Sequence, residues 1–365
     1  MERNEILVTY GKNIESMAYS LAEEADLAAR IGDRKKRIGL KPNLVVARTA
    51  SNGATTHVEV AAGLVSYLKK NNFNNIVILE GAWVGGSTTE AFNVCGYKKL
   101  AEETGVTLID TKKDKSRICD CKGLKIEICE SALTLDFMIN LPVMKGHCQT
   151  KITCALKNNK GLIPDKEKQR FHTIGLTKPI AHLNTVIRND FIVVDGICGD
   201  LDFEEGGNPI FSGRLFAAAD PVLCDAYIAS LMGYSPGDIP YITLAEKLGI
   251  GSANLDSVKI RELNSSSDEP VNLNPSLKVK KLAVYLNEKN ACSSCYASAI
   301  YALSHLDNAK LSRLKHKISV GQYFKGKNGN IGIGNCCKDF NFFCPGCPPS
   351  GEDIFKFLKK VPGSI

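Results

Sequence analysis

Two stretches of near-continuous apolar sequence, DFMINLPV at residues 136–143 and FIVVDGI at residues 191–197, decide the fold class. Runs of this kind are typical of strands that are covered on both faces, as in a parallel sheet between layers of helices. Strand patterns alternate with helical ones around them, which predicts an α/β fold, a layered domain with a largely parallel sheet. The other predicted strands cover residues 37–44, 75–80 and 106–110, and the clearest helices cover residues 57–70 and 221–233.

The composition is that of an ordinary globular protein. Of 365 residues, 44% are hydrophobic and 23% are charged, which excludes a mostly disordered chain. No apolar run approaches the roughly 20 residues of a membrane helix, and the opening residues MERNEILVTYGKN lack the apolar core of a signal peptide. We therefore expect a cytoplasmic protein with no membrane partner. The net charge of +7 suits anionic ligands, but nucleic-acid binding would need a concentrated basic patch, and we expect none.

A change of character divides the chain. Residues 264–276 read NSSSDEPVNLNPS, a polar, proline-containing segment that is typical of a linker. The sequence beyond it is rich in cysteine and glycine and has shorter elements. We therefore expect an α/β domain over residues 1–264 and a small Cys-rich α+β domain over residues 279–365.

The fourteen cysteines are unevenly placed, with eight scattered between Cys95 and Cys224 and six grouped between Cys292 and Cys347. An intracellular protein uses so many cysteines as thiolates more often than as disulfides. The six form the motifs CSSC, NCC and CPGC. Soft thiolates select zinc, Cu(I) or iron–sulfur clusters, so the tail predicts a metal site.

The residue types leave the identity of the metal open. Two CxxC pairs suit a zinc ribbon, in which four thiolates bind at about 2.3 Å. An iron–sulfur cube also needs four cysteines, commonly with a remote ligand followed by proline. Here Cys347 precedes Pro348, and the CSSC motif opens an apolar helix. This context favours a buried cluster, with zinc and reduced structural thiols as the alternatives.

Four of the six cysteines are the better ligand candidates. Cys292 and Cys295 belong to one CxxC pair, and Cys336 follows the glycine-rich turn IGIG, where the backbone can approach a cluster closely. Cys347 lies in the turn GCPP, which exposes its sulfur. The remaining two are expected to be small buried hydrophobic side chains: Cys337 and Cys344.

Polar residues follow the predicted strands of the α/β domain. Ligands of open α/β sheets bind outside the carboxyl ends of the strands, where such side chains converge. Several lysines and a histidine beside acidic groups suit an anionic substrate and provide acid–base capacity. The alternative is that these groups only cap helices and pair on the surface. The set comprises Lys41, Asn43, Glu80, Lys145, His147, Lys157, Asn158, Asp195 and Asp220.

Three other signals are weaker. Residues 81–86 (GAWVGG) follow a strand but fail the phosphate-loop patterns, so we expect a flexible turn. Cys119, Cys121 and Cys129 lack further ligands nearby in the sequence and are interpreted as structural thiols. The basic run at residues 310–317 is interpreted as a solvated helix end.

Five motifs in this order resemble the family called domain of unknown function 362: KPNLV (41–45), INLPVMKGH (139–147), TCALKNNKG (153–161), VDGI (194–197) and AADPVLCDAY (218–227). The resemblance covers about residues 41–252. Members often carry an iron–sulfur segment, so the resemblance favours one [4Fe–4S] cluster over zinc and implies the ligands Cys292, Cys295, Cys336 and Cys347. It also puts every polar residue named above except Glu80 at a motif position. The family name implies no common reaction.

We therefore predict an iron–sulfur redox enzyme that acts on an anionic small molecule at the strand ends. Lys145, His147 and Lys41 would be catalytic, with His147 as the proton donor, and Asn43, Glu80, Lys157, Asn158, Asp195 and Asp220 would bind substrate. An electron donor such as a ferredoxin would be a partner. One alternative is an electron-transfer or cluster-carrying accessory protein without its own substrate. The other is a zinc-stabilised ligand-binding protein.

Overall fold

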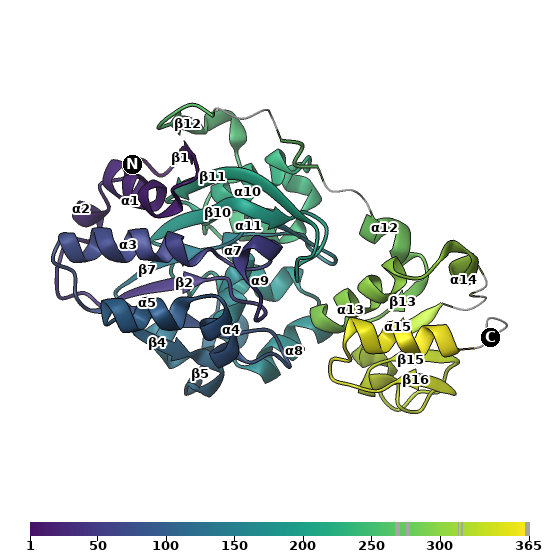
Figure 1. Ribbon diagram of the computed structural model, residues 1–365. Helices are drawn as coiled ribbons and strands as arrows, with labels where there is room; N and C mark the ends of the chain where they lie inside the picture. Colours follow the sequence, from purple (N-terminus) through teal and green to yellow (C-terminus); the bar gives the residue numbers. More distant parts are fainter. Residues whose placement is uncertain (267–270, 275–277, 313, 315–316, 362–365) are drawn as a thin grey trace. The chain divides into compact units, whose positions relative to one another are not determined.

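The computed structural model describes residues 1–266, 271–274, 278–312, 314 and 317–361. Its contacts divide the chain into two compact units (Figure 1). The α/β unit comprises Met1–Glu167 and Leu176–Pro275, and the Cys-rich unit comprises Lys168–Gly175 and Ser276–Ile365. The short segment 168–175 thus groups with the Cys-rich unit although it precedes the predicted linker. Parts of that linker and of the basic run 310–317 lie outside the described residues.

The α/β unit is built on one eight-stranded mixed sheet, which confirms the predicted fold class. All neighbouring strands are parallel except that the third strand in spatial order, β11, runs antiparallel to both of its neighbours. The spatial order is β12 (Lys259–Glu262), β1 (Glu5–Tyr10), β11 (Pro209–Ala218), β10 (Phe191–Asp200), β7 (Phe137–Leu141), β2 (Ile38–Pro42), β3 (Ile76–Glu80) and β4 (Thr107–Asp110).

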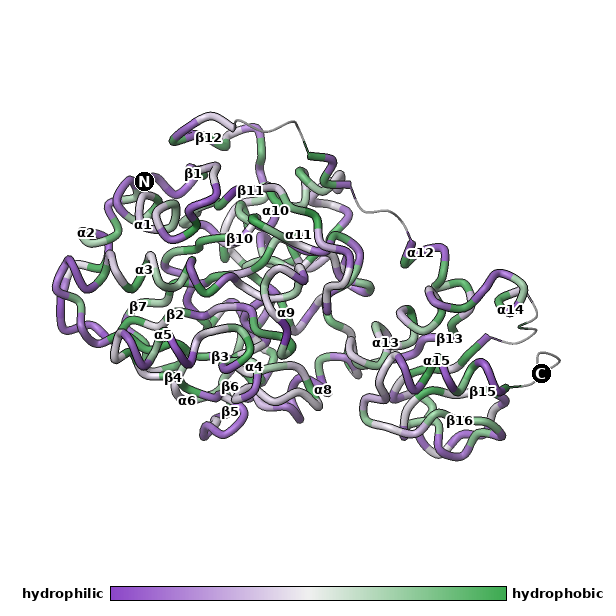
Figure 2. Tube along the Cα trace, in the orientation of Figure 1, coloured by the Kyte–Doolittle hydropathy of each residue, from purple (hydrophilic) through white to green (hydrophobic). Residues whose placement is uncertain are grey.

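The predicted apolar runs form the middle of this sheet. Every residue of β10, β7, β2 and β3 is buried, and Figure 2 shows β7 and β10 as mostly hydrophobic. Alternate residues face opposite sides of a sheet, so Leu40, Ile78 and Ile139 join one apolar core with helices such as α3 (Val58–Lys70). Lys41 and Asn140, which pair in register, face the other side. Burying each large aliphatic side chain contributes about 1.5–3 kcal/mol.

Helices cover both faces of the sheet. One group, in which α1 packs on α3, shares the core just described, and a second group packs α10 on α7 and α11 on α9. Two hairpins complete the unit: β5 (Ser116–Cys121) with β6 (Leu124–Cys129), and β8 (Lys145–His147) with β9 (Lys151–Thr153). The other helices of this unit are α1 (Ile14–Glu24), α2 (Leu27–Ile31), α4 (Thr88–Val94), α5 (Tyr97–Thr104), α6 (Glu130–Leu133), α7 (Ala155–Asn158), α9 (Thr177–Leu183), α10 (Pro221–Leu231) and α11 (Pro240–Lys247). Helix α8 (Asp165–Thr173) begins in this unit, and its residues from Lys168 onward belong to the Cys-rich unit.

The Cys-rich unit contains a four-stranded parallel sheet whose strands lie in chain order. The carboxyl ends of all four strands therefore meet at one edge. Helix α13 packs on α15. The strands are β13 (Leu286–Glu288), β14 (Ile318–Val320), β15 (Ile331–Ile333) and β16 (Phe342–Cys344), and the helices are α12 (Lys278–Ala283), α13 (Ser293–Ser304), α14 (Asn308–Ser312) and α15 (Gly351–Lys360).

Within the described ranges, no helix combines the length and the apolar character that crossing a bilayer requires.

Candidate functional site

Four cysteines gather at the carboxyl edge of the small parallel sheet. Cys292 is the N-cap of α13 and Cys295 lies in the first turn of that helix, while Cys336 follows β15 and Cys347 follows β16. All four line one cavity of about 130 Å³. The structure thus brings together the four cysteines that the sequence analysis chose as ligands.

Glycines let the backbone approach this cavity. Gly334 has a φ of +84°, a left-handed conformation that favours glycine, and a Cβ at this position would lie 3.8 Å from the sulfur of Cys295. The loops that carry Cys336 and Cys347 are tied together, since the amide of Asn335 donates to the carbonyl of Gly346 at 2.9 Å.

The two cysteines that were not predicted as ligands, Cys337 and Cys344, lie outside this cavity. Cys337 is fully buried in a small apolar cluster with Phe324 and Phe340, and its sulfur lies 3.5 Å from the carbonyl oxygen of Ser319. Cys344 is also buried. Neither residue lines the cavity, which is the placement expected of small hydrophobic side chains.

The spacing of the four sulfurs bears on the kind of metal centre they fit. Tetrahedral zinc with bonds of about 2.3 Å would hold its four sulfurs about 3.8 Å apart. Among the described residues, no three of these four sulfurs lie within 4.8 Å of one another. The donor set is all thiol, as iron–sulfur clusters require. The four sulfurs therefore do not lie at the spacing of a closed zinc site.

A cluster of charged side chains lies at the carboxyl edge of the large sheet. We call it the lysine cage and define it by Lys41, Lys145, Lys157 and the carboxylates of Glu80 and Glu204. Lys41 is the penultimate residue of β2, and its ammonium group pairs at 2.6 Å with Glu80, which ends the adjacent strand β3. Both side chains are buried, so the pair depends on good geometry to offset its loss of hydration.

Lys145 is fully buried between main-chain and side-chain acceptors. Its Nζ donates to Oδ1 of Asn43 at 3.1 Å and to the carbonyl of Glu204 at 2.8 Å. Asn43 in turn donates to Asn158 at 3.0 Å. Burial lowers the pKa of Lys145 to about 8, although the Glu204 carboxylate opposes that effect.

The carboxylate of Glu204 joins the rest of the cage. It accepts from Lys157 at 2.5 Å and from Nε2 of His147 at 3.0 Å. Nδ1 of His147 accepts from the amides of Gln149 and Thr150, so the imidazole is neutral with its proton on Nε2. Burial, with help from the Lys157 charge, lowers the pKa of His147 to about 4. Burial alone would raise the pKa of Glu204, but Lys157 and His147 hold it well below its usual range.

Glu204 is not predicted from the sequence. This residue lies in the loop LDFEEGGN (201–208), which connects β10 and β11. The available signal was the group of three lysines and one histidine after the strands, whose positive charge needs nearby carboxylates to balance it. A buried lysine requires a partner, and this acidic loop is the segment that could have supplied one.

The neighbouring carboxyl, Glu205, is also buried. Its Oε2 has no hydrogen-bond partner among the described residues. Burial, together with the adjacent Glu204 charge, raises the pKa of Glu205 to about 7.

The predicted residue Asp195 is buried in β10 and forms a separate pair. Its Oδ2 accepts from the amide of His57 at 2.7 Å and lies 2.8 Å from Nδ1 of the same residue. Burial opposes the charged imidazole, but the carboxylate outweighs it and raises the pKa of His57.

Asp220 does not join the cage. Its carboxylate caps α10 by accepting from the amides of Val222 and Leu223 at 2.8 and 3.1 Å, and it pairs with Arg3 at 3.2 Å. The strand before it, β11, runs antiparallel to β10, so the carboxyl end of β11 lies at the opposite edge of the sheet. The expectation that Asp220 binds substrate rested on a parallel strand at this position.

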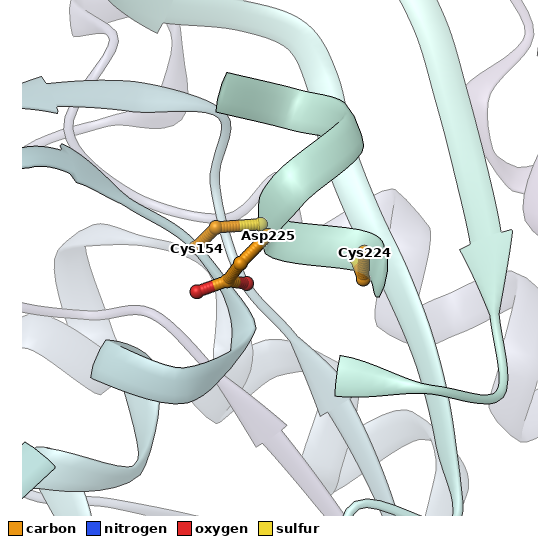
Figure 3. A group of neighbouring side chains, drawn as sticks. All are labelled: Cys154, Cys224 and Asp225. Atoms are coloured by element: carbon orange, nitrogen blue, oxygen red, sulfur yellow. The ribbon is translucent and has the colours of Figure 1, made fainter. Parts of the chain in front are cut away.

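Cys154, Cys224 and Asp225 form a buried group whose ligand atoms lie within 4.8 Å of one another (Figure 3). The carboxylate of Asp225 accepts from the amides of Ala155 and Leu156 at 2.7 and 3.3 Å. It thereby caps α7, the short helix that carries Lys157 and Asn158 into the cage. This group therefore positions cage residues.

The glycine-rich segment 81–86 and the cysteines of the β5–β6 hairpin lie where a structural role explains them. Lys112 donates to the carbonyls of Trp83 and Gly86 at 3.2 and 2.7 Å, which holds the predicted turn at residues 81–86. Cys121 and Cys129 are buried in the β5–β6 hairpin, and all fourteen cysteines are free thiols.

The chain is similar to a curated protein and to a solved structure. The thylakoid-associated protein sll1697 of Synechocystis sp. is 24% identical over 225 residues, which is 59% of this chain and 68% of that protein. The lactate racemase apoprotein of Thermoanaerobacterium thermosaccharolyticum is 14% identical with a TM-score of 0.43, over 62% of this chain and 57% of the racemase chain. So low a TM-score carries no argument about function.

The family is shown by a match over more than half of the chain. The match spans residues 38–230 and includes β2, β3, β7 and β10, which carry or adjoin most of the lysine cage. The chain therefore belongs to the family described as Domain of unknown function (DUF362).

Proposed function

We propose that the protein is an iron–sulfur redox protein whose Cys-rich unit holds one [4Fe–4S] cluster on Cys292, Cys295, Cys336 and Cys347. The observation that carries this proposal is that these four sulfurs, and no other cysteine, line one cavity at the carboxyl edge of the small sheet. Their spacing and the glycine backbone beside them support a cluster over a single zinc ion. Such a cluster supplies one-electron transfer when it is bound.

Other residues of the same cavity suit the tuning of such a group. The amide of Gln322 lies 3.8 Å from the sulfur of Cys292, and Lys325 lies in the lining with Cys336. Hydrogen bonds to sulfur and nearby positive charge both raise the reduction potential of a thiolate-bound cluster. We therefore assign Gln322 and Lys325 to positioning and electrostatic roles.

A finer proposal concerns the lysine cage, which we interpret as the site for a small anionic substrate. The supporting observation is that Lys157 and His147 already hold one anion, the carboxylate of Glu204. A substrate carboxylate or phosphate would replace it, with Lys41 and Lys145 stabilising negative charge and the Nε2–H of His147 donating a hydrogen bond; the neutral imidazole does not fit the proton-donor role predicted from the sequence. A ferredoxin-type electron donor and a cytoplasmic location belong to the same proposal. A cluster-carrying accessory protein is the rival function.

Metal analysis of anaerobically purified full-length protein tests the main proposal. A Cys₄ cluster predicts a brown protein with broad visible absorption and about four iron atoms per chain. A colourless protein with about one zinc per chain would contradict it.

Variants of the cage separate the enzyme from the accessory protein. Lys145→Met and His147→Gln should abolish the cellular activity of an enzyme while iron content and visible absorption stay unchanged. A carrier of clusters or electrons would keep its cellular activity in both variants. Lys98→Gln, an exposed change on α5, is the matched control.

A further inference from the structure

A hollow of about 450 Å³ lies on the α/β unit at the edge of the sheet where β10 begins and β11 ends. Its lining contains the cationic residues Arg3, Arg30, Lys122 and Arg188, against the single carboxylate of Asp190. Like charges around one cavity repel one another, and a bound anion relieves that repulsion. The lysine cage lies at the carboxyl ends of the parallel strands, so this hollow is a separate candidate site.

Two arginines that line the hollow, Arg3 and Arg188, keep N–H donors that could bind a ligand. Arg188 donates from Nε and Nη2 to Asp190, with a shortest distance of 2.8 Å. Arg3 donates from Nε to Asp220 at 3.2 Å and from Nη2 to the carbonyl of Ile250 at 2.7 Å. A guanidinium group carries five N–H donors in a planar fork. Both side chains therefore retain donors that these bonds do not use.

Two asparagine amides in the lining, Asn184 and Asn189, are held in fixed orientations. They end a continuous ladder in which each Nδ2 donates to Oδ1 of the next asparagine, so the floor of the hollow is ordered before any ligand arrives. A preorganised floor lowers the entropy cost of binding. The ladder starts at Lys145 and runs through Asn43 (3.1 Å), Asn158 (3.0 Å), Asn140 (2.7 Å) and Asn189 (2.8 Å) to Asn184 (3.0 Å).

We propose that this hollow, the basic pocket, binds a phosphate-bearing small molecule. Its four cations come from four separate segments: the residues before β1, helix α2, the β5–β6 turn and the residues before β10. A phosphate group presents oxygens in several directions and accepts paired hydrogen bonds from arginine forks, whereas one planar carboxylate reaches fewer of these groups. The volume lies within the roughly 300–1,000 Å³ that is usual for small-molecule sites. The proposal is independent of the cluster and of the lysine cage.

Calorimetric titration of the full chain with pyrophosphate at low ionic strength tests this proposal. Saturable binding is expected, with affinity that falls as salt is raised. Arg30→Gln and Lys122→Gln should each weaken binding about tenfold, the effect of losing one charge-assisted hydrogen bond. Lys122→Arg should retain the affinity because it keeps the charge. Lys98→Gln removes an equal charge from an exposed helix outside the pocket and should leave the affinity unchanged.

Three outcomes would overturn the proposal. The first is the absence of saturable pyrophosphate binding at millimolar concentration. The second is an equal loss of affinity in Lys98→Gln and Lys122→Gln, which would indicate a general charge effect. The third is tighter binding of citrate than of pyrophosphate, which would identify a polycarboxylate site. Unfolding midpoints of the ligand-free variants, which should match the wild type, ensure that lost binding is not lost folding.

Discussion

The imidazole of His147 donates from Nε2 to Oε2 of Glu204 at 3.0 Å, inside a part of the α/β unit where both residues are buried. The other oxygen of the same carboxylate accepts from Lys157 at 2.5 Å. A single loop residue thus neutralises one buried ammonium group and fixes the tautomer of one buried histidine. The polar edge of the large sheet depends on this loop for its charge balance.

Glu204→Gln should therefore be strongly destabilising. The variant leaves the Lys157 ammonium buried without its anion, and breaking a buried pair in this way costs about 3–5 kcal/mol. Urea denaturation should show a lower midpoint with little change in slope. Asp202→Asn, on the same loop but half-buried, is the control and should change stability by less than about 1 kcal/mol. Equal losses in the two variants would contradict the role assigned to Glu204.

The buried carboxyl of Glu205 should make the folding stability depend on pH. Its folded-state pKa is raised to about 7, above the value of about 4.3 in an unfolded chain. The folded state therefore holds a proton that the unfolded state has released, and this contribution is present below about pH 4.3 and is lost as pH rises to about 7. The loss is on the order of 3 kcal/mol. Stability curves of wild type and Glu205→Gln should diverge over this window, and parallel curves would show that the carboxyl does not titrate there.

His147 should act with the opposite sign over a similar range. Its pKa of about 4 in the folded state lies below its unfolded value of about 6.5. The unfolded state therefore binds the extra proton first, and stability falls as pH decreases from about 6.5 to about 4. His147→Gln should remove this part of the pH dependence. The test is the difference in unfolding free energy between wild type and His147→Gln, measured from about pH 4 to about pH 6.5. If the imidazole were charged in the native state, this difference would not change over that range.

The pair formed by Lys41 and Glu80 should show strong coupling. Each single variant, Lys41→Met or Glu80→Gln, leaves one buried group without its partner and should cost about 3–5 kcal/mol. The double variant should cost clearly less than the sum, because no unpaired charge remains. Additive losses in chemical denaturation would contradict a direct interaction between the two side chains.

The cysteines of the tail offer a matched comparison between neighbours in the chain. Cys336→Ala should lose most of the iron and the visible absorption because Cys336 lines the cavity, whereas Cys337→Ala should keep both because Cys337 packs among phenylalanines. Cys337→Ala should show only a modest loss of stability from the small cavity it creates. Retained iron in Cys336→Ala together with lost iron in Cys337→Ala would overturn the ligand assignment.

The sequence predicted the α/β architecture and the middle of the large sheet, because runs such as 136–143 and 191–197 are apolar on both faces. It missed that β11 is antiparallel, since strand direction depends on pairing partners and leaves no local pattern. That one reversal explains why Asp220 lies at the opposite edge from Lys41. Glu204 was missed for a related reason, because it enters the cage from a loop that no strand-end rule identifies.

The cysteine tail was more predictable than the cage. The motifs CSSC, NCC and CPGC follow strands or open a helix, and parallel strands in chain order bring their carboxyl ends together. The placement of Cys336 in the cavity lining and of Cys337 in the apolar cluster agrees with this local turn chemistry. The distances between the four sulfur atoms could not be predicted from the sequence, because they depend on the register between strands that are far apart in the chain.

We propose above that the Cys-rich unit holds one redox-active iron–sulfur cluster, and one spectrum can decide this. The proposal is tested most directly by the electron paramagnetic resonance spectrum of the anaerobically purified, dithionite-reduced protein, with iron measured on the same sample. We expect about four iron atoms and about one unpaired spin per chain, as one reduced Cys₄ cluster requires. A spectrum without a signal, from a colourless sample that contains zinc and no iron, would contradict it.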